Sequence, residues 1–227
     1  MAIKAKKLNA SKLPGRTELY EVGSSCELPV EEKQKDGSLD RVILIYCVEK
    51  GNIGYFAKEY RPIDVEKTGA KVIDITAVML DCGEKCVRWH LYDIKDTLAG
   101  ENTIVKLYDQ WSFGLRYLQK NILDGVTGYR VIPDLGVITR CYDERRMERL
   151  RDDYQKRCGE IENYQQNMPL ALRKKRVSIA KYRGILRAAQ SLLDRRFQTE
   201  DGTDTYEIHI RQLKDEKGQV YQLRFLV

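Results

Sequence analysis

Short runs of apolar residues, bounded by turn-forming residues, recur along the first part of the chain and predict β-strands. A turn at Gly51-Asn52 predicts a hairpin between the first two runs, and a tight turn at 82–85 predicts a second hairpin between the next two. Pro133-Asp134 marks a break in the last run. The pattern indicates a meander of at least four strands, followed by one more strand or pair of strands. The expected strands are 41–48, 53–60, 72–80, 86–95 and 128–140.

Helical periodicity appears between and after these runs. In 103–122 the apolar residues step by three and four, which predicts a helix with one stripe packed on the sheet. In 142–198 two such stripes, 147–161 and 179–193, flank a break at Asn167-Met168-Pro169. This pattern predicts two antiparallel helices that pack through narrow stripes and carry charge on their outer faces.

Strict alternation returns at the C-terminal end. Residues 205–213 alternate, 215–218 form a turn and 220–227 return, which predicts a β-hairpin that joins the main sheet or a partner. The expected fold class is α+β or α/β, with a mixed, largely antiparallel sheet, a packed helix, a helical hairpin and this C-terminal hairpin. The expected regions are a mixed-sheet core at 1–141, a basic helical hairpin at 142–198 and a β-hairpin at 199–227.

Composition narrows the class of protein. A chain of 227 residues with 42% hydrophobic residues is long enough to bury its own core. We expect a loosely held arm at 1–16, a short strand and turn at 17–30, and a surface loop at 31–40. The start of the chain is basic without an apolar segment, and no apolar run reaches membrane-spanning length, so a cytoplasmic protein without membrane contact is expected. The six scattered cysteines fit reduced thiols.

The spacing of Cys82, Cys86 and His90 resembles a metal clip. Along a strand, however, Cys86 and His90 lie about 13 Å apart, too far for one tetrahedral zinc ion. Zinc is therefore not expected.

Positive charge is concentrated in the second of the two helices predicted in 142–198. The net charge is +6, but the segment from Arg173 to Arg196 alone contains nine Lys or Arg residues and the single acid Asp194, which leaves −2 for the remainder. A basic element on a nearly neutral body is typical of nucleic-acid binding. The alternative is a solvated helix face, although such a face normally interleaves acids. The expected phosphate contacts are Arg173, Lys174, Lys175, Arg176, Lys181, Arg183 and Arg187.

The second hairpin gathers charge in an otherwise apolar ribbon. If its turn pairs Asp81 with Cys86, the constant sum of paired positions places Asp74 opposite Asp93. Lys95 then shares the face of Asp93, because side chains two apart in a strand point the same way. Facing carboxylates repel each other, and a divalent cation would offset the repulsion. The alternative is a solvated rim with a weak surface ion pair.

Asp74, the hairpin, the series Asp93-Ile94-Lys95 and the following helix together resemble the core motif of the PD-(D/E)xK nuclease superfamily. The resemblance covers roughly residues 60–140. It implies that Asp74, Asp93 and the carbonyl of Ile94 hold Mg²⁺. It also implies that Lys95 is the catalytic lysine, which positions or activates the attacking water.

The resemblance also suggests catalytic roles for Gln110 and Tyr117, because many exonuclease-like members carry a Gln and a Tyr on the next helix. Here these residues are seven apart, about two helical turns, and the usual interval is shorter. Ile73, and not a proline, precedes Asp74. The family usually opens its core with a helix that carries a glutamate, and no helical pattern surrounds the nearest acids, which are Glu18, Glu21 and Glu59.

The sequence therefore predicts a metal-dependent endo- or exonuclease that hydrolyses phosphodiester bonds in DNA or RNA with Mg²⁺. The alternative is a non-catalytic nucleic-acid-binding or assembly subunit of a mobile-element or defence complex, in which the basic helical hairpin docks on nucleic acid or an acidic partner. A third possibility is a protein that uses 142–198 as its interface in a homodimer or larger complex. No glycine-rich phosphate loop and no Ser/His/Asp or Cys/His pattern favours nucleotide hydrolysis or protease chemistry. The placement of the two central carboxylates distinguishes an enzyme from a binding protein.

Overall fold

The structure is a computed structural model of the chain. It describes the residues 18–20, 25–33, 39–47, 53–60, 73–81, 83–117, 130–167, 173–213 and 220–226. Within these residues the fold is α/β, with three helices and a mixed sheet. The predicted arm at 1–16 lies outside the described residues.

The larger sheet has seven strands in the order β1-β4-β5-β6-β7-β9-β8. Pairing is antiparallel from β1 to β6, parallel from β6 through β7 to β9, and antiparallel again between β9 and β8. The four strands from β6 to β8 thus form a mixed, mostly parallel portion, and the antiparallel pairs lie mainly before it. The strands are β1 (Glu18–Tyr20), β4 (Ile53–Tyr60), β5 (Ile73–Asp81), β6 (Cys86–Thr97), β7 (Arg130–Cys141), β8 (Arg196–Gln198) and β9 (Thr205–Gln212).

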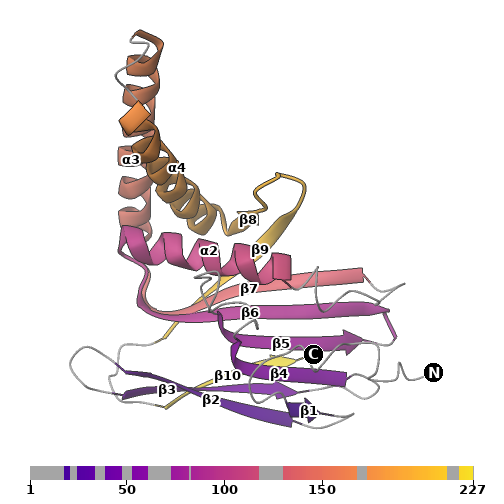
Figure 1. Ribbon diagram of the computed structural model, residues 1–227. Helices are drawn as coiled ribbons and strands as arrows, with labels where there is room; N and C mark the ends of the chain where they lie inside the picture. The colour runs from indigo at the N-terminus through magenta and orange to yellow at the C-terminus, as the bar shows by residue number, and fades with distance from the viewer. Residues whose placement is uncertain are drawn as a thin grey trace.

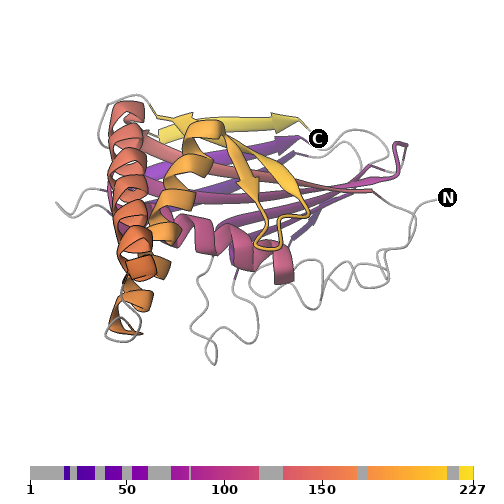
Figure 2. The same ribbon diagram turned by 90° about the horizontal axis from the view of Figure 1, so that it is seen from above.

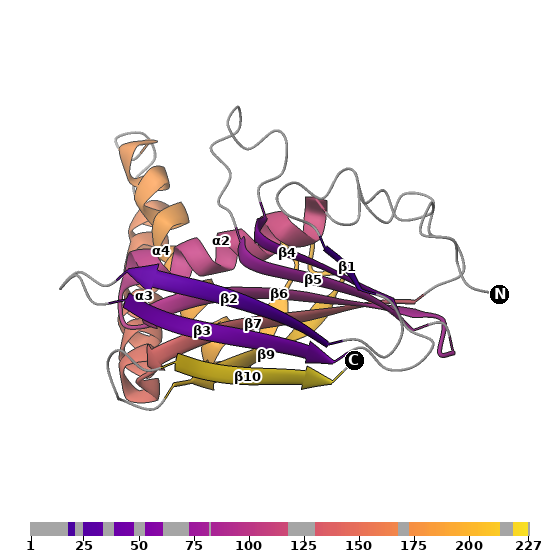
Figure 3. The same ribbon diagram turned by 90° about the horizontal axis from the view of Figure 1, so that it is seen from below.

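A separate three-stranded sheet contains β2 (Ser25–Lys33), β3 (Leu39–Cys47) and β10 (Val220–Leu226). It lies on the side of the larger sheet away from the helices (Figures 1 and 3). The predicted hairpin across Gly51-Asn52 is wrong, because β3 pairs with β2 and β10 whereas β4 pairs with β1 and β5. The predicted surface loop at 31–40 is partly wrong, since β2 and β3 extend into both of its ends.

The predicted C-terminal β-hairpin is also wrong. Both edges of β9 are already paired, one with β7 and one with β8, so β10 has no edge of β9 to join. It adds instead to β3, in parallel. The expectation that this tail joins the main sheet holds for β9. The predicted break at Pro133-Asp134 is wrong as well, because β7 continues through it.

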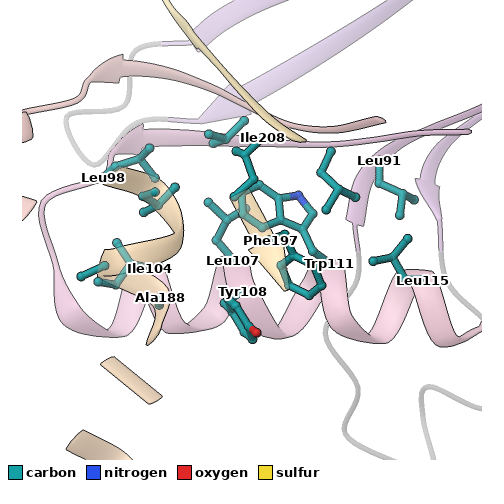
Figure 4. Packing of buried hydrophobic residues seen from close by; sticks show 14 of the residues in the cluster. Leu91, Leu98, Ile104, Leu107, Tyr108, Trp111, Leu115, Ala188, Phe197 and Ile208 are labelled. Atoms are coloured by element: carbon teal, nitrogen blue, oxygen red, sulfur yellow. The ribbon is translucent and has the colours of Figure 1, made fainter. Parts of the chain in front are cut away.

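Helix α2 (Glu101–Tyr117) follows β6 and lies across the larger sheet (Figures 1 and 2). The predicted stripe packs as expected, with Ile104, Leu107, Trp111 and Leu115 buried (Figure 4). The helix is described up to Tyr117 and not to the predicted 122, because 118–129 lie outside the described residues.

The helical hairpin is confirmed: α3 (Glu144–Asn167) and α4 (Arg173–Asp194) pack against each other. We call this pair the arm. The arm rises from the end of the sheet where β6 and β7 finish and α2 begins (Figure 1). On the sheet side, α4 buries Ala188, Ala189 and Leu192 in the main core. The arm is therefore anchored at its base and projects from the sheet at its far end.

The core fixes the height of α2 above the sheet. Phe197 of β8 meets Trp111 of α2 edge-on, with ring centroids 6.2 Å apart. Further along the helix, a Cβ on Gly114 would lie 2.5 Å from Ile73 Cδ1 and 3.2 Å from a methyl of Leu91. The glycine therefore lets α2 approach the start of β5 and the middle of β6, close to the predicted charged residues.

Candidate active site

The register of the central hairpin is the predicted one. Asp81 pairs with Cys86, and the ladder continues to the pair Ile75 and Tyr92. The turn is closed by a carboxylate, because Asp81 Oδ1 accepts a hydrogen bond of 2.8 Å from the NH of Glu84. The ladder ends at Ile75 and Tyr92, so the predicted pairing of Asp74 with Asp93 would come one position beyond its last pair.

The structure brings Asp74, Asp93 and Lys95 together. The Oδ2 atom of Asp74 accepts the NH of Ile94 at 2.9 Å and lies 4.0 Å from Lys95 Nζ. Lys95 Nζ also forms an ion pair with the carboxylate of Asp93 and donates to the carbonyl of Ile94 at 3.2 Å. All three groups predicted to hold Mg²⁺ thus gather around one ammonium group. We call these four residues the carboxylate site.

Burial disfavours the negative charge of the carboxylate site. The side chain of Asp93 is 0% exposed, that of Lys95 14% and that of Asp74 31%. Burial raises the pKa of Asp93 well above its usual range, the hydrogen bond and charge of Asp74 raise it further, and Lys95 only partly opposes them. Two carboxylates beside one amine are short of positive charge. Hard oxygens in this setting fit a divalent cation such as Mg²⁺.

Gln110 lies on the sheet side of α2 and is 1% exposed. It is one helical turn before Gly114, which contacts Leu91 of β6, and Leu91 shares its strand face with Asp93. Because α2 runs back along β6, this turn places Gln110 toward the Asp93 end of the strand. The backbone of Tyr117 ends α2, and its side chain lies outside the described residues.

The described residues supply no third carboxylate. No group of three or more His, Cys, Asp or Glu side chains among them is arranged to hold a metal ion. Glu21 and the side chains of Glu18 and Glu59 lie outside the described residues. The ligands that the structure describes are thus two carboxylates and one carbonyl.

The predicted basic surface is only partly described. Arg173, Lys174, Lys175 and Arg176 form the first turn of α4, and their side chains lie outside the described residues. Those of Lys181, Arg183 and Arg187 are exposed. Arg183 is partly neutralised, because it pairs with Glu162 of α3 at 2.5 Å.

The excess charge of the arm resides in one helix. Helix α3 contains six acids and six bases, whereas α4 contains seven bases and one acid. The predicted basic helical hairpin therefore consists of one basic helix, α4, and one neutral helix, α3.

A second polar cluster lies on the opposite face of β6, and the sequence did not predict it. Its centre is Asp134 of β7, whose Oδ2 lies 2.8 Å from His90 Nδ1. Its Oδ1 accepts the Tyr92 hydroxyl at 3.1 Å and lies 3.3 Å from His209 Nε2. We call these four residues the strand clamp, because they join β6, β7 and β9. Both histidines of the chain belong to it.

The partners of Asp134 in the strand clamp favour its ionised form. Burial alone would raise the pKa of Asp134, but the hydrogen bond and charge of His90, the charge of His209 and the Tyr92 hydroxyl outweigh it and lower that pKa. Gly136 makes room for the cluster, since a Cβ there would lie 2.1 Å from the ring of Tyr92. His209 is 41% exposed. The sequence could have indicated this cluster only through the pairing of His90 with Asp134 in parallel strands. That pairing can be predicted only if the connection between the two strands is already known.

None of the described helices combines the length and apolar character needed to cross a membrane. Among the residues that the structure describes, the carboxylate site and the strand clamp are two polar clusters that join neighbouring strands. Comparison with known proteins adds no family to this geometry: no family model, no curated protein and no solved structure matches the chain.

Proposed function

We propose that the protein is a metal-dependent nuclease that hydrolyses phosphodiester bonds in DNA or RNA, with a core of the PD-(D/E)xK type. The observation that carries the proposal is the gathering of Asp74, Asp93 and Lys95 around the carbonyl of Ile94. The order of elements supports it, because an antiparallel hairpin leads into a helix and then into a strand parallel to the second hairpin strand. A surface ion pair, the alternative reading, does not bury a carboxylate completely.

The exposure of each residue in the carboxylate site indicates its role in the proposed reaction. Asp93, Asp74 and the carbonyl of Ile94 would hold Mg²⁺, which in such a site stabilises charge on the phosphate and lowers the pKa of the attacking water. Asp93 is fully buried on the face of β6 that α2 approaches at Leu91, so its carboxylate is kept from bulk water. Asp74 is partly exposed and marks the side from which a phosphate enters. Lys95 Nζ is placed to carry a proton or to oppose developing negative charge.

In this proposal the arm contacts the nucleic acid away from the scissile bond. It stands at the end of the sheet where β6 finishes, which is also the end that holds Lys95 (Figure 1). From Arg173 to Arg187 helix α4 spans roughly 21 Å at 1.5 Å per residue. This length corresponds to about six base pairs at 3.4 Å each. The proposal therefore includes backbone contacts several nucleotides from the scissile bond.

Cleavage of end-labelled single- and double-stranded DNA and RNA, with and without Mg²⁺, tests the proposal. The unaltered protein should cleave at least one of these substrates only when Mg²⁺ is present. Asp93→Ala should abolish cleavage while leaving binding through α4 intact, because the two features lie on different elements. Cleavage that persists in Asp93→Ala would contradict the assignment.

A non-catalytic nucleic-acid-binding or assembly subunit is the second candidate. The one-sided charge of α4 favours it, since that surface binds phosphates whether or not a metal is present. Binding without cleavage of any of the four substrates would support this candidate. Charge reversal at Lys181 should then weaken binding and lower its salt dependence, whereas reversal at Lys156 of the neutral α3 should not.

A further inference from the structure

The amine of Lys95 lies where the oxygens of the carboxylate site meet. It is in contact with Asp93, 3.2 Å from the carbonyl oxygen of Ile94 and 4.0 Å from Asp74 Oδ2. These are the same three groups that would hold a metal under the proposed function. One ammonium group therefore already supplies part of the positive charge that the two carboxylates require.

The amine and a divalent cation cannot share these oxygens. A cation such as Mg²⁺ binds oxygen at about 2.1 Å, so it would lie between the same atoms that Lys95 now contacts. Two positive groups would then be adjacent in a region where Asp93 is fully buried, and repulsion is strong where water is excluded. Lys95 has a flexible stem with an ammonium at its tip, so it can withdraw.

We infer that Lys95 is an internal counter-cation, which holds the two carboxylates together in the metal-free protein and which an entering divalent cation must displace. The inference rests on the proposed function, because it concerns the same oxygens. Lys95 thereby sets the metal affinity of the site. Asp74, partly exposed and 4.0 Å from the amine, gives the displaced group a second partner on the side toward solvent.

The inference reverses the usual expectation for a residue of a metal site. Removing the positive charge of Lys95 removes the competitor and should tighten metal binding. Removing the charge of Asp93 removes a ligand and should weaken it. Two neighbouring residues on β6 are therefore expected to change the affinity in opposite directions.

Titration of the full-length chain with Mn²⁺, followed by electron paramagnetic resonance, measures this affinity without reference to cleavage. Lys95→Met keeps the length of the side chain without its charge and should bind Mn²⁺ at least tenfold more tightly than the unaltered protein. Lys95→Arg keeps the charge and should not bind more tightly. Asp93→Asn should lose binding. Mg²⁺ should compete with Mn²⁺ in each variant that binds.

Thermal unfolding with and without Mn²⁺ covers the case in which Lys95→Met folds poorly without metal. The variant then leaves two carboxylates with no counter-cation, so Mn²⁺ should raise its melting temperature more than that of the unaltered protein. A larger metal-dependent rise supports the inference. An equal or smaller rise overturns it.

The outcomes separate this inference from the proposed function. If the unaltered protein binds Mn²⁺, Asp93→Asn does not, and Lys95→Met binds no more tightly, the metal site stands and the role of Lys95 as competitor is wrong. If neither the unaltered protein nor Lys95→Met binds Mn²⁺ at millimolar concentration, the metal site itself is wrong, and both statements fail together.

Discussion

Two polar clusters occupy opposite faces of the same strand, and they differ in how their charges are satisfied. On one face of β6, the strand clamp surrounds the single carboxylate of Asp134 with nitrogens and a hydroxyl from two neighbouring strands. On the other face, the carboxylate site sets Asp74 and Asp93 against one amine. The strand clamp is complete as built, whereas the carboxylate site is short of one positive charge.

The fully buried Asp93 and the partly buried Asp134 show this difference, because their pKa values shift in opposite directions. The surroundings of Asp134 lower its pKa despite its burial, because His90, His209 and Tyr92 favour the ionised form. The pKa of Asp93 is raised, because burial and Asp74 outweigh Lys95. A network that favours the ionised form of its carboxylate suits the joining of strands, and one that disfavours it fits a site that accepts a cation. The comparison therefore separates a structural cluster from a functional one on a single element.

The largest expected effect is on cleavage, and only substitutions in the carboxylate site, on one face of β6, should cause it. Asp93→Asn keeps the shape of the side chain and removes a metal ligand, so Mg²⁺-dependent cleavage should fall roughly a thousandfold, equivalent to several kcal/mol of transition-state stabilisation. Asp134→Asn is the matched control on the other face and should keep its rate within about twofold in the folded protein. Single-turnover rates on the best substrate measure both. Equal losses in the two variants would remove the distinction.

Stability should depend more on Asp134 than on Asp93, the opposite of what is expected for cleavage. Asp134→Ala removes the acceptor for Tyr92 and the partner of both histidines, and three lost contacts at about 1 kcal/mol each predict a loss of about 3 kcal/mol. Asp93→Ala, measured without metal, removes a carboxylate that burial disfavours and should cost less. Urea denaturation of both variants in a chelating buffer measures the difference. If Asp93→Ala is the more destabilised, the charge argument is wrong.

Substitution of Gly136 tests whether the strand clamp needs the space that this glycine leaves for Tyr92. A methyl group at Gly136 would overlap the ring of Tyr92, so Gly136→Ala should lower the free energy of unfolding by about 1–3 kcal/mol. A Cβ on Gly114 would meet the terminal methyls of Ile73 and Leu91, which are the ends of flexible side chains and can move, so Gly114→Ala should cost less. A smaller cost of Gly136→Ala in a Tyr92→Leu background would confirm the cause, and an unchanged cost would contradict it.

The parts of this arrangement that depend on local sequence could be predicted. The pairing of Asp81 with Cys86 follows from a short turn, and every pair of β5 and β6 then follows by counting. The stripes of α2 and the arm follow from helical periodicity in the same way. The carboxylate site could be predicted because both of its strands belong to one hairpin.

The strand clamp and the strand order could not be predicted, because they depend on distant pairing. His90 meets Asp134 only if β7 lies parallel to β6 in one particular register after the α2 crossover. Likewise β10 looks like the partner of β9 in sequence, and only the presence of β7 and β8 on both edges of β9 sends it to β3. Alternating residues indicate a strand but do not say which edge it joins.

The smallest expected effect is on the pH dependence of stability, where the two clusters should differ in sign. The lowered pKa of Asp134 means that its contribution is present above the unfolded pKa, near 3.9, and is lost as pH falls through the lower folded value. The raised pKa of Asp93 means that, in the metal-free protein, its contribution is present below the unfolded value and is lost as pH rises through the folded one. Urea unfolding from pH 3 to pH 8 in a chelating buffer therefore has two distinct readouts. Asp134→Asn should flatten the acid side of the stability curve and Asp93→Asn the other side, because each variant removes one carboxylate whose pKa differs between the folded and unfolded states. If both variants flatten the same side, the two carboxylates share one electrostatic environment, and the contrast between the faces of β6 does not hold.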